Sequence, residues 1–350
     1  MSTTQMVGTP APDTIIGQDG AERIIALAGA DSVVAAAGPD TLIGNQGEDT
    51  LNGCAGNDVA SGGSGADIVR GEAGNDALFG FLGDDTIEGG TGNDRLMGGP
   101  GDDLLDGGEG LDRALYTDAA QSIFADLGAG RVSVGDEQDL LVSVENLTAS
   151  RFDDFVMGSD GANRLLGNDG ADLMLGGAGN DTIDGNRGND VLRGGDGSDV
   201  MSGGSGDDVL FGDNGNDALF GFVGDDLLLG GAGNDRLLGG SGRDTLVGGD
   251  GHDVFIARAV DGVPAEPDII ADFAAWDRME FTSYGAGDVV LTEPRCGPAI
   301  RFNESGRVMS GTARRARRGS LSVRLPPPCR APGSRSRRWW CWRTVRPAPG

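Results

Sequence analysis

Residues 194–202 read Gly-Gly-Asp-Gly-Ser-Asp-Val-Met-Ser, and this nine-residue pattern recurs through residues 158–256 without a change of phase. In each full copy an aspartate stands two residues after a glycine and two residues before a large apolar residue. The aspartates of this array are Asp172, Asp181, Asp190, Asp199, Asp208, Asp217, Asp226, Asp235, Asp244 and Asp253. A period held over so many copies is the signature of a repeat architecture, so the repeat determines the fold.

The nine residues predict one short strand and one tight turn. The last three residues of a copy alternate outward, inward and outward, as in a strand, and only the large apolar residue points inward. The glycines of the other six residues can adopt positive φ and let the chain turn sharply. Two copies therefore make one coil of a flattened roll. We predict an all-β fold, a parallel β-roll (β-solenoid) of nonapeptide repeats.

A second array lies earlier in the chain, at residues 13–115, and it is a copy of the array at 154–256. The stretch GNDALFGFLGDDTIEGGTGNDRLMGGPGDD at 74–103 recurs as GNDALFGFVGDDLLLGGAGNDRLLGGSGRD at 215–244, a shift of 141 residues that also relates Asp13 to Asp154. The sequence therefore predicts two tandem rolls. The earliest copies are degenerate, as terminal repeats often are, so full metal sites are expected only from about Asp40 onward.

Stacked coils place the repeat aspartates in columns, where like charges repel unless a cation lies between them. Carboxylate oxygens and the carbonyl oxygens of glycine-rich turns suit Ca²⁺, which takes 6–8 hard ligands, better than Mg²⁺, which needs a strict octahedron. Several Ca²⁺ ions are thus the expected cofactors. The predicted ligands are the ten aspartates named above together with Asp40, Asp49, Asp58, Asp67, Asp76, Asp85, Asp94 and Asp103.

These in-phase copies resemble the repeats-in-toxin (RTX) family of hemolysin-type calcium-binding repeats. The resemblance covers roughly residues 12–115 and 154–256. It implies a parallel β-roll in which Ca²⁺ lies between the turns of successive coils, bound by the Asp side chain and loop carbonyls. It also implies a secreted, extracellular protein with no cleaved N-terminal signal peptide, exported by a type I exporter that reads a C-terminal signal.

The segments outside the arrays are a lead-in at 1–12, a strand-rich connector at 116–153, a cap at 257–305 and a basic tail at 306–350. The connector breaks the phase, and its Val144-Glu145-Asn146-Leu147-Thr148 resembles inserts between arrays of the family. Asp272-Phe273 and Asp277-Arg278 resemble the segment that follows such arrays. Cys54 occupies a turn-glycine position, and the four cysteines predict no disulfide framework.

The charge distribution separates the body from the tail. All 55 acidic residues lie before residue 305, whereas twelve arginines follow it, so the body carries 15 − 55 = −40. This charge argues against nucleic acid and anionic membranes as partners, and no apolar run could span a membrane. The Arg- and Pro-rich tail indicates a frameshift near residues 305–312 or disorder. A frameshift would remove the export signal, and the alternative is a genuine basic tail that binds an acidic partner.

No catalytic site is expected, so the chain is predicted not to be an enzyme. His252 is the only histidine, which excludes a two-histidine zinc protease motif, and no G-x-S-x-G elbow occurs. The expected function is calcium binding by a secreted protein that folds on Ca²⁺ binding outside the cell. The alternatives are an extracellular adhesion or matrix protein with structural calcium and, more weakly, a non-catalytic part of a secreted enzyme or toxin.

The outward positions of the array at 154–256 include apolar residues. Because two repeats make one coil, alternate repeats should share a face, and such faces could mediate contact between rolls or with a cell surface. One face is expected to carry Val209, Phe211, Leu227, Leu229, Thr245 and Val247, and the other Phe220, Leu238, Val254 and Ile256.

Overall fold

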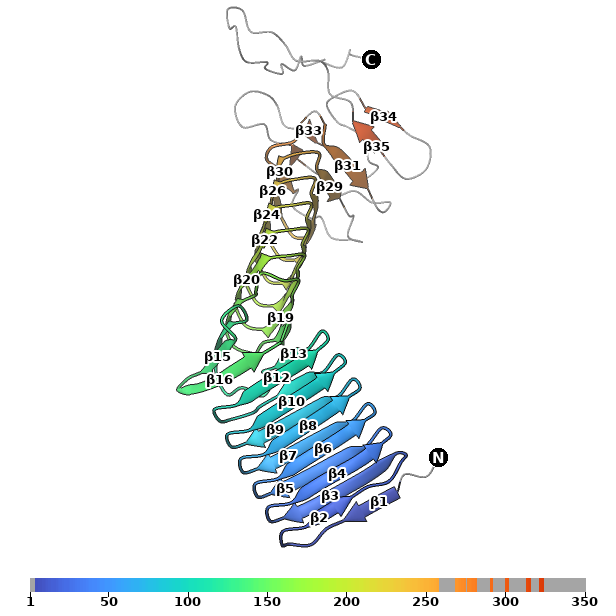
Figure 1. The fold of residues 1–350 in the computed structure, drawn as a ribbon. Coiled ribbons are helices and arrows are strands. Elements are labelled where there is room, and N and C mark those ends of the chain that lie inside the picture. Colours follow the sequence, from blue (N-terminus) through green and yellow to red (C-terminus); the bar gives the residue numbers. More distant parts are fainter. Residues whose placement is uncertain are drawn as a thin grey trace, which may run out of the picture. The chain divides into compact units, whose positions relative to one another are not determined.

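The computed structural model describes residues 4–257, 268–274, 276–281, 290–291, 300–301, 313–315 and 321–323 (Figure 1). Every regular element in these ranges is a β-strand, and almost all strand pairs are parallel. The predicted all-β parallel β-roll is therefore confirmed. No helix long and apolar enough to cross a membrane is found in this part of the chain.

The chain divides into two compact units, Met1–Ala178 and Gly179–Gly350. In unit 1, sheet 1 runs in the order β1 (Thr4–Val7), β3 (Glu22–Ala28), β5 (Thr41–Gln46), β7 (Val59–Ser64), β9 (Ala77–Leu82), β11 (Arg95–Met97), β13 (Arg113–Leu115), β17 (Asn146–Thr148) and β19 (Arg164–Asp169). Sheet 2 runs in the order β2 (Thr14–Ile16), β4 (Ser32–Ala37), β6 (Thr50–Ala55), β8 (Ile68–Ala73), β10 (Thr86–Thr91), β12 (Leu104–Glu109), β16 (Glu137–Val142), β15 (Arg131–Val134), β14 (Ile123–Asp126), β18 (Phe155–Met157) and β20 (Leu173–Ala178).

Unit 2 has the same two-sheet plan. Its sheet 1 comprises β21 (Thr182–Arg187), β23 (Val200–Ser205), β25 (Ala218–Val223), β27 (Arg236–Ser241), β29 (Val254–Ala257) and β31 (Arg278–Phe281). Its sheet 2 comprises β22 (Val191–Asp196), β24 (Val209–Asn214), β26 (Leu227–Ala232), β28 (Thr245–Asp250), β30 (Ile269–Ile270), β32 (Val290–Leu291) and β33 (Ile300–Arg301). A separate pair is formed by β34 (Ala313–Arg315) and β35 (Leu321–Val323).

The strand register follows the repeat. Leu42 lies beside Ala60, and Ala60 lies beside Leu78, so neighbouring strands of a sheet are 18 residues apart. Two repeats thus make one coil, as the period predicts. The large apolar residue of each repeat faces the interior, and Leu42, Leu51, Leu78, Leu210 and Leu228 are fully buried. One buried apolar residue per repeat gives a core that is only one side chain deep on each sheet.

The predicted sharing of outward faces by alternate repeats is also observed. Val209, Leu227 and Thr245 are register partners in sheet 2 of unit 2, whereas Phe220 and Leu238 are partners in sheet 1. The outward residues named above are half-buried within these columns, except Ile256, which is buried. The larger exposed side chains of this unit lie at other positions, with Phe222 41 % and Val223 56 % exposed.

The connector continues both sheets of unit 1. Strand β16 pairs in parallel with β12, and β17 pairs in parallel with both β13 and β19. Within sheet 2, β14 pairs with β15 and β15 pairs with β16, both in the antiparallel direction. Unit 1 therefore contains the first array, the connector and the first strands of the second array, and the connector bounds at 116–153 stay a prediction.

Part of the predicted cap continues the sheets of unit 2. Strand β31 pairs in parallel with β29, and β30 pairs in parallel with β28 and β32. Apart from β34 and β35, the predicted basic tail at 306–350 lies outside the described residues, as does most of 282–305. Cys54 is a free, half-buried thiol whose backbone has φ 73°, the conformation that glycine adopts at this position in other copies.

Candidate metal sites in the repeat turns

The repeat aspartates form two series of hydrogen bonds, one in each column of turns, because each bond joins residues 18 apart; both series together are here called the inner ladder. The backbone N–H of Asp58 donates to Oδ1 of Asp76 (2.7 Å), and the N–H of Asp76 donates to Oδ1 of Asp94 (2.8 Å). In unit 2 the N–H of Asp208 donates to Oδ1 of Asp226 in the same way (2.9 Å). Each carboxylate is thus fixed by the coil that precedes it, and only its Oδ1 is used.

All the predicted ligands lie in this turn position, and each is at most 3 % exposed. Two further aspartates, Asp31 and Asp112, are equally buried and occupy the same ladder, although the prediction did not include them. Their position in the nine-residue phase was the available signal. The sequence predicts no full site at Asp31 because its copy lacks turn glycines, but the carboxylate is held by the backbone N–H of Asp13.

The second carboxylate oxygen of most of these aspartates is buried and has no hydrogen-bond partner among the described residues. A buried acceptor without a donor is costly, and a buried charge without a partner is more so. The oxygens concerned are Oδ2 of Asp31, Asp40, Asp49, Asp58, Asp67, Asp76, Asp85, Asp94, Asp103, Asp112, Asp199, Asp208, Asp217, Asp226, Asp235, Asp244 and Asp253. An orphaned oxygen repeated in this way indicates that each of these turns needs a positively charged partner.

In many of these turns a backbone carbonyl faces the orphaned oxygen across a glycine. A Cβ atom on Gly71 would lie 2.2 Å from Oδ2 of Asp76 and 2.6 Å from the carbonyl oxygen of Gly89. On Gly221 it would lie 2.2 Å from Oδ2 of Asp226 and 2.6 Å from the carbonyl of Gly239. Only glycine fits there, because any side chain would occupy the space between two acceptors. Converging oxygen acceptors with no donor match the all-oxygen ligand set of Ca²⁺.

Side chains alone would not make a conventional metal cluster. Among the described residues, no group of three or more His, Cys, Asp or Glu side chains gathers around one point. Each turn instead offers one carboxylate together with backbone carbonyls. A soft or nitrogen-preferring metal is therefore a poor match, whereas a hard cation that accepts carbonyl ligands fits.

The electrostatics of the ladder point the same way. Burial, the largest cause, raises the pKa of Asp85 and Asp226 to about 7 and that of Asp103 to about 8, with neighbouring acids adding to the effect. The backbone hydrogen bond at Oδ1 lowers each pKa but does not cancel the burial. These three carboxylates would thus be partly neutral at physiological pH unless a cation stabilises the charged form.

An outer ladder of hydrogen bonds runs beside the inner one, in the opposite sense. It uses the residue before each repeat aspartate: the N–H of Asn75 donates to Oδ1 of Asn57 (2.9 Å), and the N–H of Asn93 donates to Oδ1 of Asn75 (2.7 Å). The prediction treated this position as variable. The recurrent Gly-Asn-Asp and Gly-Asp-Asp triplets were the signal that could have identified it.

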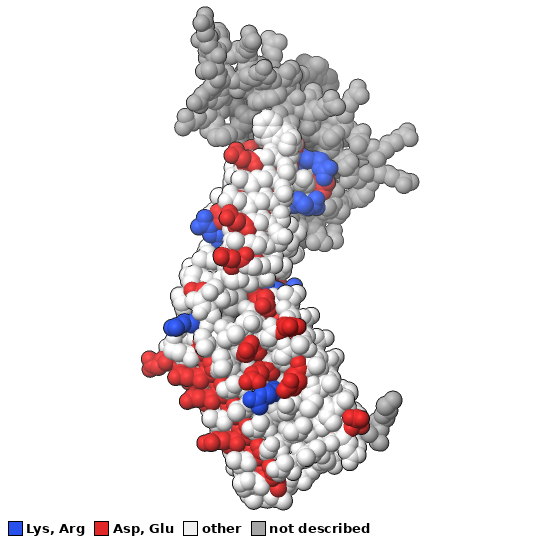
Figure 2. Space-filling view, in the orientation of Figure 1, with Lys and Arg blue, Asp and Glu red and all other residues white. Residues whose placement is uncertain are grey.

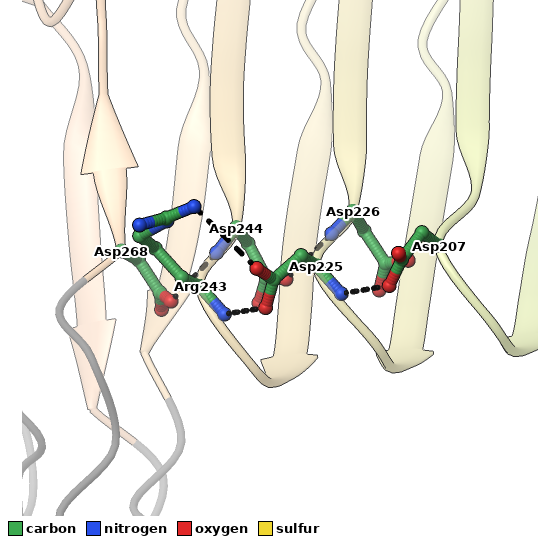
Figure 3. A network of polar contacts seen from close by, with 6 residues as sticks. All are labelled: Asp207, Asp225, Asp226, Arg243, Asp244 and Asp268. Carbon is green, nitrogen blue, oxygen red and sulfur yellow. Dashed lines mark hydrogen bonds and ion pairs between the residues drawn. The ribbon is translucent and has the colours of Figure 1, made fainter.

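Figure 3 shows both ladders near the C-terminal end of unit 2. The outer ladder joins the N–H of Asp225 to Asp207 and the N–H of Arg243 to Asp225, each at 2.8 Å. The inner ladder joins the N–H of Asp244 to Oδ1 of Asp268 at 3.2 Å. Asp268 belongs to the predicted cap and follows Asp244 by 24 residues rather than 18, so the cap continues the ladder without the repeat.

Beside the repeats, the inner ladder includes Asp139 of the connector and Asp154 directly after it, whose second oxygens have protein donors. The N–H of Asp103 donates to Oδ1 of Asp139 (3.0 Å), while the buried hydroxyl of Tyr116 donates to Oδ2 of Asp139 (2.8 Å). The N–H of Ile123 donates to Oδ1 of Asp154 (2.8 Å), and the N–H of Ser150 donates to its Oδ2 (2.7 Å). These two carboxylates are saturated by the chain itself.

The outer surface of the arrays is acidic. Acidic side chains outnumber basic ones on the face of the molecule in Figure 2. Several arginines are engaged locally, as in the Arg70–Glu88 pair (2.6 Å) and the Arg193–Asp213 pair. His252 is exposed and lies 6.3 Å from Trp276 between ring centroids, consistent with a turn residue.

The RTX calcium-binding nonapeptide repeat matches the chain at residues 7–42, 25–60, 43–78, 52–87, 79–114, 148–183, 184–219 and 220–255. These matches cover more than half of the sequence, and the chain belongs to this family of calcium-binding repeats. No match was found among curated proteins. The matched segments coincide with the coils that carry the inner ladder, and the unmatched 115–147 coincides with the connector.

Proposed function

We propose that the chain binds several Ca²⁺ ions in its repeat turns and folds fully only when they are present. The observation that carries the proposal is the recurrent, buried and orphaned Oδ2 of the inner ladder. Bound Ca²⁺ would supply the positive charge that these turns lack and would be coordinated by their oxygen atoms. The residues themselves hold Oδ1 in place through the backbone, keep the turn compact at glycine and present carbonyl oxygens to the same space.

The test is a Ca²⁺ titration of the full chain followed by circular dichroism, with Mg²⁺ as the control ion. A cooperative gain of β-structure with Ca²⁺ alone is expected, because neighbouring coils share ladder bonds. Asp85→Asn should raise the Ca²⁺ concentration needed, since it keeps the Oδ1 acceptor but removes the charge. Asp160→Asn, at an exposed position, is the matched control. An equal gain of β-structure with Mg²⁺ would contradict the proposal. So would the same Ca²⁺ requirement for Asp85→Asn and Asp160→Asn.

We further propose that the protein is secreted without a cleaved N-terminal signal and folds outside the cell. Support comes from the family, from the low affinity typical of extracellular calcium modules, about 10⁻⁴–10⁻³ M, and from the strongly acidic body. A metal-free body of net charge −40 repels itself and stays expanded, which suits export. The test is to detect the protein in culture medium with an intact N-terminus. The protein should disappear from the medium when a type I exporter is disrupted. Retention in the cell would contradict it.

An adhesion or matrix role is a second candidate, and exposed apolar residues favour it. Phe81, Leu82, Phe222 and Val223 are each more than two-fifths exposed, although a stable calcium roll needs none of them. Under this alternative, calcium is structural and the function resides on the outer faces. We also propose that the chain has no catalytic activity of its own, because the repeated carboxylates suit ligands rather than one acid–base pair.

A further inference from the structure

A shallow groove crosses sheet 1 of unit 1 and has a volume of about 640 Å³. Its floor is strand β7, where Ser61, Gly63 and Ser64 are all small. One side carries Asn45 of β5, and the other carries Phe81 of β9. Asn45, Gly63 and Phe81 are register partners, so the groove results from small residues between larger ones. Leu27, three strands from Phe81, extends the lining to about 14 Å along the sheet.

Phe81 is strained and contributes little to the core. Its backbone has φ 80°, a left-handed conformation that is a genuine outlier for a bulky residue. Its side chain is 44 % exposed, and its ring stacks on that of Phe79 with centroids 6.0 Å apart. Glycine would satisfy the backbone at this position, as Gly63 does one coil earlier. Strain retained for an exposed aromatic ring indicates a use for the ring.

Unit 2 repeats the aromatic, small and asparagine residues of this arrangement, with Asp184 and Arg187 where unit 1 has Ile43 and Gln46. Phe222 has φ 77°, is 41 % exposed and stacks on Phe220 at the same 6.0 Å. Its register partner is Gly204, whose own partner is Asn186, and Ser202 and Ser205 complete the small-residue strand. The chain thus carries the strained ring, the small floor and the facing asparagine twice.

The chemistry of the groove selects one class of ligand. Asn45, Gln46 and Ser61 provide amide and hydroxyl groups without charge, and Phe81 provides an exposed apolar ring. An added peptide strand needs a free sheet edge, but β7 is central in its sheet. A purely apolar ligand would leave the amides unpaired. A polyanion would be repelled by the acidic body.

We propose that this groove on β5, β7 and β9 binds a neutral, extended polysaccharide. The C–H face of a sugar ring would pack on Phe81, and neighbouring hydroxyl groups would bond to the side chains of Asn45, Gln46 and Ser61. The groove is open and its lining spans successive strands of the sheet, so it suits an extended glycan. This proposal goes beyond calcium binding, which would only hold the grooved face in shape.

The experiment is isothermal titration calorimetry of the calcium-saturated full chain with cellohexaose, xylohexaose and mannohexaose. Binding of at least one probe is expected. The variant Phe81→Gly/Phe222→Gly should weaken that binding by about tenfold, roughly the contribution of a stacked ring. Because glycine suits φ near 80°, this variant removes the rings without destabilising the turns, and circular dichroism in Ca²⁺ confirms that it is folded.

Cys54→Gly is the matched control, since it makes the same backbone change on the opposite sheet at φ 73°. It should bind the probe as the parent does. Failure of a folded parent to bind any of the three probes would overturn the proposal. So would unchanged binding by the double glycine variant, or tighter binding of hexagalacturonate, which is anionic. A chain that does not fold in Ca²⁺ would instead contradict the proposed calcium function.

Discussion

The repeat turns and the connector turns of unit 1 use the same ladder but complete it differently. In a repeat turn, Oδ1 of Asp94 accepts a backbone N–H and Oδ2 has no partner. In the connector, Oδ1 of Asp139 accepts the same kind of bond, and Tyr116 donates to its Oδ2. The ladder therefore does not itself require a metal. The proposed calcium dependence is then a local property, set by whether the chain provides a donor for the second oxygen.

Removal of calcium should produce the largest difference in stability between the repeat turns and the connector turns. With a chelator at neutral pH, the repeat strands β5 to β10 should lose amide protection, because many uncompensated buried carboxylates cannot remain packed. Tyr116 and Asp139 should hold the connector turn together longer. Hydrogen exchange measured by mass spectrometry would compare the two regions. Full protection of the repeat strands without calcium would show that both kinds of turn are complete.

Acidification should partly replace calcium in the repeats. The folded-state pKa values of Asp85 and Asp226, about 7, lie above the ordinary value of 3.8. The folded, metal-free chain therefore binds more protons than the unfolded chain between about pH 4 and pH 7. Its stability falls as the pH rises through that window and is greatest below it.

The measurement is circular dichroism of the metal-free chain as a function of pH. A gain of β-structure is expected as the pH falls from about 7 towards about 4. Calcium affinity should fall over the same range, because the ion needs the ionised carboxylate. A metal-free chain that gains β-structure as the pH rises would refute this interpretation of the ladder.

Tyr116→Phe would convert a connector turn into one that resembles a repeat turn. It leaves Oδ2 of Asp139 buried without a donor, which costs about 1–3 kcal/mol in the free energy of unfolding. The loss should persist at saturating calcium, because the site is built for a hydroxyl. Urea denaturation in excess Ca²⁺ measures it. Recovery of parent stability at high Ca²⁺ would instead mean that the ion enters the connector turn.

Cys54→Gly should produce the smallest change, a gain of about 1 kcal/mol. The left-handed backbone at Cys54 has φ 73°, and relief of a residue with a Cβ in that conformation is worth about 1–2 kcal/mol, less the entropy that glycine loses on folding. The same denaturation experiment in Ca²⁺ would detect it. A loss of stability would show that the thiol contributes contacts that outweigh the strain.

The repeating part of the molecule was largely predictable because its signal is local and periodic. The phase of Asp172 to Asp253 placed two repeats in each coil and one apolar residue in the core, and the structure has this arrangement. The same phase gave the position of the predicted ligands, whose role as metal ligands remains a proposal. Asp31 was missed because degenerate glycines were given more weight than the phase.

The connector was less predictable because its partners are distant in sequence and occur once. Nothing periodic relates Tyr116 to Asp139, and the pairing depends on how β14 and β15 fold back within sheet 2. The antiparallel strand pairs and the continuation of both sheets through β16 and β17 follow from tertiary packing. The donors that saturate Oδ2 therefore had no counterpart in the pattern.

The shift of 141 residues between the two arrays bears on how the gene can lengthen by duplication. Asp13 precedes β2 and Asp154 precedes β18, and both strands lie in the same sheet of unit 1. After one module length, the chain therefore returns to the sheet in which the module began. An insertion of nine residues would move every later repeat to the other sheet, whereas a tandem duplication of the whole module keeps each repeat in its original sheet. Copy number could then vary between descendants without any compensating substitution.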